Sequence, residues 1–326
     1  MKTIVVSVFV LCFYVSNAQL TWTNVDSLYQ PLPPSVHVFF TSQKIDTSPF
    51  RAFYVSADLK EKKLDFTTDT SENRRFTPSQ FYERNHDALV VVNGTFFSFE
   101  TNQNLNLVVK KGKLIAYNQH FAPARGRDTL TYWHLLPSAI GISKKREAAV
   151  AWTYTDSSRK KPYADQWWSA PVRDSDKLES LSQVVNRTSL VNGHRRGHTR
   201  SQKKWKVETA IGGGPVLLQN GETKITNNEE RKFAGKAIND KHPRTAMGYT
   251  ADNKLIILVV EGRNPNAAGA TLTQEAEILK ALGCVEALNL DGGGSSCLLV
   301  NGKETIKPSD KEGQRAVPAV FIIRQK

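Results

Sequence analysis

Cysteine is scarce in this sequence, and its scarcity excludes several kinds of site. The chain has 3 cysteines in 326 residues. Cys12 lies in an apolar N-terminal segment, which leaves Cys284 and Cys297 for the rest of the chain. Two thiolates cannot form a four-cysteine metal site, and no C-x-x-C pair is present. The two cysteines flank a glycine-rich turn almost symmetrically, which leaves a disulfide open in an oxidising compartment.

Long apolar runs are also scarce. One such run covers residues 4–15, follows Lys2 and precedes the small-residue motif of residues 16–18. It is too short to span a bilayer, and its flanks are typical of a secretory signal peptide. We therefore predict a signal peptide over residues 1–18 and a single catalytic domain over residues 19–326. A periplasmic or secreted protein with no transmembrane segment is expected.

Acidic residues are in the minority. The chain has 31 Asp and Glu against 44 Lys and Arg, which gives a net charge of +13. Many of the basic residues fall in residues 194–206, inside a polar stretch (residues 156–206) that we interpret as a basic insertion. This run is either a solvated surface loop or a surface that attracts anionic glycans or phosphates. In an exported protein we expect no nucleic-acid partner.

Strand-like alternation of apolar and polar residues covers much of the chain. Glycine turns at residues 111–112 and 301–302 predict hairpins. One helix is predicted over residues 272–282, because Thr271 and Gln274 form a capping box. These elements predict an α+β fold with a mixed, largely antiparallel sheet and a few packed helices. The predicted strands are 36–41, 50–57, 88–92, 105–109, 113–117, 148–154, 215–219, 245–250, 254–261, 286–290, 297–300 and 317–323.

Glu275 is the unusual residue of the predicted helix. It falls between Leu279 and Leu282 on the apolar side, whereas Glu277 falls outside that stripe. A carboxylate on an inward face is unfavourable unless it is paired or used, although the first turn of a helix favours negative charge. Either a small helix rotation brings Glu275 to solvent, or Glu275 is a functional or buried paired acid.

The most informative segment is residues 289–296, with the sequence NLDGGGSS. An apolar strand leads into Asp291, and three glycines follow it. Glycine has no Cβ, so its backbone can adopt positive φ and a ligand can approach its N–H groups closely. An isolated sequence of this kind is also compatible with a tight turn, in which the Asp satisfies local amides.

Other polar segments lie at the ends of apolar strands and favour a functional interpretation. They are residues 93–97 (NGTFF), 211–215 (IGGGP), 242–246 (HPRTA) and 261–263 (EGR). Arginine forks and glycine amides bind phosphate or carboxylate oxygens, and two separated carboxylates are typical of glycoside cleavage. The candidate catalytic residues are Asp291, Glu275 and Arg244, which we expect around one water-accessible hollow. The candidate substrate-binding residues are Asn93, Gly94, Gly213, Gly214, His242, Thr245, Glu261, Arg263, Gly292, Gly293 and Ser295.

Taken together, these segments and the spacing from Thr271 to Glu275 resemble the phosphodiester glycosidase family. The resemblance runs from about residue 88 to residue 323 and is densest over residues 209–301. The first 60 or so residues after the signal peptide and the 156–206 stretch carry none of it. Glu261 stands where the family pattern has Asp, and residues 264–268 replace a more Ser-rich segment.

The resemblance implies a hydrolase that removes an N-acetylglucosamine-like sugar from a sugar-1-phosphodiester by cleaving the C1–O bond. Asp291 would be the base or nucleophile, with Glu275 as the second carboxylate or an electrostatic partner. Arg244, with Arg263 or His242, would hold the phosphate. Asn93 and the glycine loops would position hydroxyls and phosphate oxygens. The implied partner is a phosphorylated glycan or a sugar-1-phosphodiester.

Two other functions stay open at this stage. Ser295 or Ser296 could be the nucleophile of a serine hydrolase, although no G-x-S-x-G is present and a distant histidine would have to be the base. The chain could also be a non-catalytic module that binds glycans or anions. No cofactor is required by the sequence, but a divalent cation near Asp291 and Glu261 is compatible with it.

Overall fold

Alternating apolar residues build four antiparallel sheets in this computed structural model. It describes residues 20–123, 131–158, 160–168, 172–173 and 203–326. The predicted signal peptide and most of the predicted insertion lie outside these residues. In the part of the chain that is described, no helix is long and apolar enough to cross a membrane.

The largest sheet has eight strands and carries the site loops on its central strands. In spatial order they are β1 (Thr23–Asn24), β2 (Val36–Ile45), β3 (Ser48–Asp58), β19 (Lys254–Val260), β18 (Arg244–Thr250), β20 (Cys284–Asn289), β16 (Val216–Gln219) and β17 (Glu222–Thr223).

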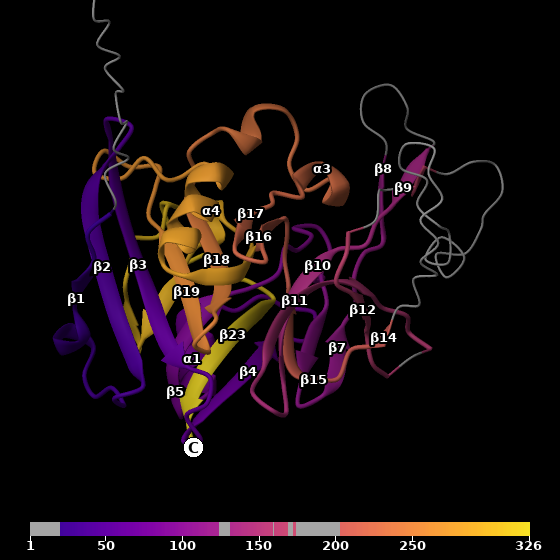
Figure 1. Cartoon of the computed structure of the whole chain (residues 1–326), viewed down its shortest axis with the longest axis horizontal. Coiled ribbons are helices and arrows are strands. Elements are labelled where there is room, and N and C mark those ends of the chain that lie inside the picture. The colour runs from indigo at the N-terminus through magenta and orange to yellow at the C-terminus, as the bar shows by residue number, and fades with distance from the viewer. Residues whose placement is uncertain (1–19, 124–130, 159, 169–171, 174–202) are drawn as a thin grey trace, which may run out of the picture.

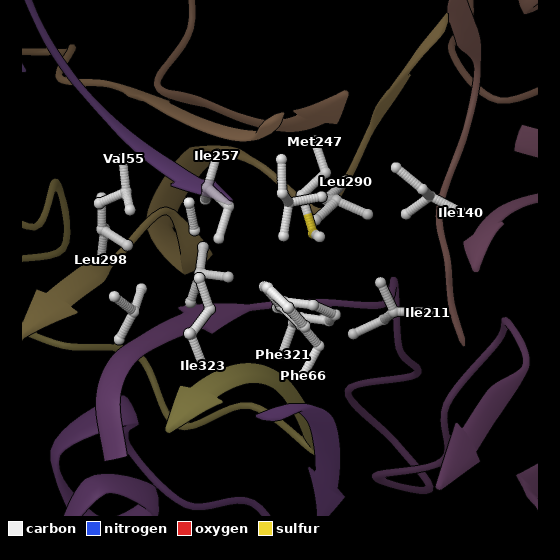
Figure 2. Packing of buried hydrophobic residues seen from close by; sticks show 14 of the residues in the cluster. Val55, Phe66, Ile140, Ile211, Met247, Ile257, Leu290, Leu298, Phe321 and Ile323 are labelled. Carbon is white, nitrogen blue, oxygen red and sulfur yellow. The ribbon is translucent and has the colours of Figure 1, made fainter. Parts of the chain in front are cut away.

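A five-stranded sheet faces the largest one. Its strands are β22 (Lys303–Glu304), β21 (Leu298–Val300), β5 (Ala88–Asn93), β23 (Ala319–Gln325) and β4 (Leu64–Thr70). Figure 2 shows how the two sheets pack, with Val55, Met247 and Ile257 on one side and Phe321 and Ile323 on the other. Each such side chain contributes about 1.5–3 kcal/mol when it is fully buried.

Two further sheets complete the fold on the side away from β1 and β2 (Figure 1). The seven-stranded sheet consists of β14 (Lys203–Lys204), β12 (Tyr163–Asp165), β11 (Ala148–Tyr154), β10 (Ser138–Ser143), β15 (Val207–Gly212), β6 (Val108–Lys110) and β7 (Lys113–Ala116). The three-stranded sheet consists of β13 (Val172–Arg173), β9 (Tyr132–His134) and β8 (Phe121–Pro123).

The helices are short. Within the described residues, the α-helices are α1 (Pro78–Arg84), α3 (Asn227–Glu230) and α4 (Leu272–Ala281), and the 3-10 helices are η1 (Asp26–Tyr29), η2 (Gly235–Ile238) and η3 (Gly293–Ser295). Helix α4 packs on β16, β18 and β20, and it lies in front of β18 in Figure 1. Its capping box is formed as expected, because Thr271 Oγ1 accepts from Gln274 N at 3.1 Å.

The predicted fold class is confirmed, since the sheets are antiparallel and the helices few. Each predicted strand has a counterpart, but the strand expected from residue 105 begins only at Val108. Leu105 N donates to the Phe96 carbonyl at 2.8 Å and Leu107 N to Asn118 Oδ1 at 2.8 Å, so this segment bonds to loops. Cys284 and Cys297 are buried free thiols, so the disulfide left open by the sequence is not formed.

The antiparallel order explains why distant motifs meet. Ala246 pairs with Asn289, so the beginning of β18 lies beside the end of β20. Val320 pairs with Asn93 at the end of β5. The Asp291 amide donates to the Gly94 carbonyl at 3.0 Å and joins the two facing sheets at this edge. Three motifs far apart in the sequence therefore converge on one corner of the molecule.

Candidate active site

The backbone of Asp291 is held from two sides. Its amide is bonded to Gly94, and Asn93 Nδ2 donates to its carbonyl at 2.6 Å. Just before it, Asn289 Nδ2 donates to the Gly214 carbonyl at 2.8 Å. Asn93 is itself fixed, because Thr245 Oγ1 donates to its Oδ1 at 3.0 Å. The two asparagines and Thr245 are fully buried and form a frame behind the loop rather than its surface.

The Asp291 side chain is partly exposed and faces positive charge. Burial raises its pKa to about 6, against the opposing effects of the Ser295 hydroxyl, the Gly292 amide and the charges of Arg315 and Lys232. A carboxyl with this pKa is mostly ionised at neutral pH and can accept a proton just below it. These are the properties of a general base or a nucleophile.

The glycines after Asp291 allow neighbouring groups to approach closely. Gly293 has φ +62°, and a Cβ there would lie 3.1 Å from Nη2 of Arg263. A Cβ on Gly294 would overlap the guanidinium of Arg315, and one on Gly292 would lie 2.9 Å from the Pro243 carbonyl. Because these glycines have no side chains, Arg263, Arg315 and the backbone just before β18 can lie against the loop.

Gly94, Gly213 and Gly214 make a similar close approach below the loop. A Cβ on Gly94 would overlap Ile211, and one on Gly213 would overlap the Asn289 carbonyl. Gly214 has φ +115° and lies against the side chains of Glu230 and Lys232. These glycines pack the strand ends together beneath Asp291.

Arg263 and His242 lie at the outer side of the loop. Arg263 is exposed, and its Nη2 is 3.4 Å from His242 Nδ1. Burial lowers the pKa of His242, and the charges of Arg244 and Arg263 lower it further, which favours the neutral imidazole. Arg263 is thus an exposed cation beside Gly293, and its neighbour His242 favours the neutral form.

Arg244 is 3% exposed and its guanidinium is held in place. Nε donates to the Ala270 carbonyl at 3.0 Å and Nη2 to the Asp240 carbonyl at 3.2 Å. The guanidinium carbon lies 5.6 Å from the centroid of the Phe233 ring. The side chain is therefore rigid, with an aromatic ring over it.

Glu275 does not reach the surface. It is 0% exposed, so helix rotation does not bring it to solvent, and the expected water-accessible hollow does not include it. Burial raises its pKa to about 8, and the charge of Arg244 opposes this shift. Glu275 is therefore inward and buried, but in the described part of the chain neither of its oxygens has a hydrogen-bond partner, and the charge of Arg244 is the interaction that acts on it.

The Glu261 carboxylate contacts residues outside the Asp291 loop. Its Oε2 lies 3.5 Å from Arg51 Nε and accepts from the Lys307 amide at 3.3 Å, while Oε1 accepts from Asn264 Nδ2 at 3.0 Å. These bonds anchor the segment after β19. Among the described residues, no group of three or more His, Cys, Asp or Glu side chains is arranged to hold a metal ion.

Sequence reasoning missed Lys232 and the aromatic rings near it. Lys232 Nζ lies 4.8 Å from the Phe96 ring centroid, and Phe96 packs edge-on against Phe233 at 5.9 Å. Burial lowers the pKa of Lys232 to about 8, against the charges of Glu230 and Asp291. Lys232 follows a short polar helix, and no local pattern marks it.

Arg315 is the second missed cation. It forms a two-pronged ion pair with Asp310, with N–O distances of 2.7 and 2.9 Å, and its Nη1 lies 3.4 Å from Ser295 Oγ. Its guanidinium carbon also lies 5.3 Å from the Phe99 ring centroid. Asp310 therefore orients Arg315 toward the Asp291 loop.

The site thus combines one reactive carboxyl with several fixed cations. The charges of Lys232 and Arg315 act on Asp291 directly, the Arg263 guanidinium lies against Gly293, and the backbone of Arg244 lies near Gly292. Such an arrangement binds an anion beside a carboxylate. In the described part of the chain, Ser295 contacts Asp291 and Arg315, and Ser296 contacts Thr245. Among the residues that the structure describes, neither hydroxyl has the histidine partner that a serine nucleophile needs.

Comparison with known proteins gives consistent matches. A sequence model described as phosphodiester glycosidase matches residues 144–324. The SPbeta prophage-derived uncharacterized protein YomE of Bacillus subtilis (strain 168) is 41% identical over 85 residues, 26% of this chain and 13% of that protein. N-acetylglucosamine-1-phosphodiester alpha-N-acetylglucosaminidase of Mus musculus is 32% identical over 102 residues, 29% of this chain and 20% of that protein. The alignments therefore span a fifth or less of these relatives.

Solved structures share the fold over nearly the whole chain. The zebrafish N-acetylglucosamine-1-phosphodiester alpha-N-acetylglucosaminidase catalytic domain, auto-inhibited by its pro-peptide, aligns with a TM-score of 0.60 and 20% identity. That alignment covers 95% of this chain and 89% of the zebrafish chain. A hypothetical protein from Synechocystis aligns with a TM-score of 0.57 and 16% identity, over 94% of this chain and 68% of that one.

Proposed function

The chain belongs to the phosphodiester glycosidase family, and we propose that it hydrolyses sugar-1-phosphodiesters at the bond between C1 and the phosphate oxygen. The sugar is N-acetylglucosamine-like, by analogy with the named relatives. The sequence of residues 1–18 supports export to the periplasm or the exterior.

The convergence of cations around Asp291 is the observation that carries this proposal. A phosphodiester brings a negative charge beside C1, and the charge grows on the leaving phosphate as the bond breaks. Lys232, Arg315 and Arg263 come from three separate loops and meet at the Asp291 turn. Preorganised cations that face developing charge lower the barrier directly.

In the proposed reaction, water and Asp291 have the following roles. The C1–O bond breaks and its electron pair leaves on the phosphate monoester, while water supplies the hydroxyl that ends on C1. The ionised Asp291 carboxylate activates that water or attacks C1 itself. Because a phosphate monoester is already a good leaving group, the site needs no strong general acid.

Glu275 supports this reaction from behind the site. It is fully buried and cannot contact a substrate, but its charge acts on Arg244 and opposes the lowering of that guanidinium's pKa by burial. Arg244 is in turn fixed under Phe233, next to the rings that flank Lys232. We propose that Glu275 and Arg244 keep this wall of the site rigid.

One alternative is supported by the same geometry. With Glu275 buried, the site exposes one of the two predicted carboxylates, which suits a module that binds phosphorylated glycans without cleaving them. Such a module would bind a sugar-1-phosphodiester tightly and show no turnover.

A substrate screen separates these functions. The purified chain is incubated with a set of sugar-1-phosphodiesters, and free sugar and phosphate monoester are measured. The p-nitrophenyl glycoside of N-acetylglucosamine, which lacks phosphate, is the control. We expect release of both products from the phosphodiester at a rate well above that from the control. Binding without release would favour the module, and no interaction with any phosphodiester would overturn both.

A further inference from the structure

A second groove, separate from the Asp291 site, has a different chemistry. It has a volume of about 600 Å³ and lies between the segment after β5, the end of β7 and the end of β4. Its lining includes the amides of Asn73, Asn102, Gln103 and Gln119 and the rings of Tyr117 and Phe121. We call these six residues the amide groove.

The amide groove offers hydrogen-bonding groups of both kinds beside aromatic faces. Each side-chain amide can both donate and accept a hydrogen bond. Tyr117 is 43% exposed and Phe121 is 50% exposed, although both are large and apolar in part. A ligand with hydroxyls on its edge and C–H groups on its faces would satisfy both features.

Charge separates this groove from the Asp291 site. Of the described residues that line it, none is a lysine or an arginine, and Glu72 is the one charged residue. The whole chain nevertheless has a net charge of +13. An anionic ligand would be drawn to the many cations elsewhere, so the groove suits a neutral ligand.

Backbone hydrogen bonds link the groove to residues near the Asp291 site. The backbone N–H of Gln119 donates to the Leu105 carbonyl at 3.0 Å, and the backbone N–H of Leu105 donates to the Phe96 carbonyl at 2.8 Å. Phe96 then packs against Lys232 on the other side. The segment from Phe96 to Leu105 therefore connects the neutral groove to the cations near Asp291.

We propose that the amide groove binds a neutral oligosaccharide. Sugar rings have hydroxyl edges for the amides and C–H faces for Tyr117 and Phe121, and they carry no charge. A site of this kind would hold the uncharged part of a glycan near the Asp291 site. The proposal does not depend on cleavage, because binding in this groove uses none of the residues assigned to the reaction.

Titration calorimetry with the full chain tests it, using chitohexaose, cellohexaose and maltohexaose as probes. We expect at least one hexaose to bind, and Tyr117→Ala and Asn102→Ala each to weaken that binding by about tenfold or more. Trp167→Ala is the matched control, since Trp167 is 56% exposed and does not line the groove. It should leave the affinity unchanged.

Two further measurements locate the occupant. Asp291→Asn should keep hexaose affinity, and Tyr117→Ala should keep the cleavage rate of a small sugar-1-phosphodiester. The proposal is overturned if no hexaose binds, if both groove variants bind as the wild type does, or if Asp291→Asn abolishes binding. Circular dichroism of each variant checks that the fold is intact.

Discussion

The fully buried carboxylate of Glu275 lies within the electrostatic reach of Arg244, yet neither of its oxygens has a hydrogen-bond partner among the described residues. Arg244 Nε donates to the Ala270 carbonyl and its Nη2 to the Asp240 carbonyl. Burial is therefore the stronger influence and raises the pKa of Glu275 to about 8.

This relationship predicts how stability changes with pH. A buried acid whose folded pKa lies above its unfolded value stabilises the fold below the unfolded pKa and loses that contribution as pH rises through the folded pKa. For Glu275 the window runs from about 4.5 to about 8. Glu275→Gln should remove a slope of up to about 1.4 kcal/mol per pH unit from the unfolding free energy in this window.

Urea denaturation of both proteins between pH 4.5 and 8 measures that slope. Glu277→Gln is the control, because Glu277 is exposed on the same helix. If Glu275 is instead ionised and paired with Arg244, the unfolding free energy of Glu275→Gln at neutral pH would be about 3–5 kcal/mol lower, because the buried Arg244 charge would lose its partner.

The pH dependence of turnover should be bell-shaped. Asp291 must be ionised to act as base or nucleophile, so the rate should fall as pH drops below about 6. Lys232 must be protonated to stabilise the phosphate, so the rate should fall as pH rises above about 8. Initial rates from pH 4 to 10 measure both limbs. A Lys232→Met variant should lose the alkaline limb, and an unchanged alkaline limb would remove Lys232 from the account.

Arg263→Ala should weaken phosphate-bearing substrates selectively. Arg263 is exposed beside Gly293, so its removal should leave the unfolding free energy within about 0.5 kcal/mol of wild type. Loss of a charge-assisted contact to phosphate should lower kcat/KM by about 10- to 100-fold, equivalent to 1.4–2.7 kcal/mol. Lys62→Ala, which removes an exposed cation in the loop between β3 and β4, is the control. Equal losses on a neutral glycoside would contradict the assignment.

Asp291→Asn should abolish turnover while the fold is preserved. The amide keeps the size of the side chain but can neither attack C1 nor remove a proton from water. We expect kcat to fall by about 10³-fold or more. Asp87→Asn, at an exposed position, should retain full activity. A thermal melt of the variant close to that of wild type would show that folding is not the cause.

Much of this site could be predicted because it lies at strand ends. Asp291, Asn93 and Arg244 each follow or precede an apolar strand, and antiparallel pairing brings those ends together. The inward position of Glu275 also followed from helical periodicity. The sequence could not show whether an inward acid touches the cavity or lies behind it, because that depends on the packing of neighbouring elements.

The remaining parts of the site lie in loops, where the sequence has no regular repeat of apolar and polar residues. Lys232 follows a four-residue helix, and Arg315 is placed by its ion pair with Asp310. Both also contact rings far away in the chain, Lys232 that of Phe96 and Arg315 that of Phe99. Glu261 shows the opposite case, since its motif predicted substrate contact and its carboxylate is bonded to Arg51 and Asn264.

The most direct test of the account is to run the hydrolysis of a sugar-1-phosphodiester in water labelled with ¹⁸O and to analyse both products by mass spectrometry. Cleavage of the C1–O bond at the Asp291 site predicts that the label appears on the released sugar and that the phosphate monoester stays unlabelled. Label on the phosphate would mean that the P–O bond breaks, and it would contradict the central claim.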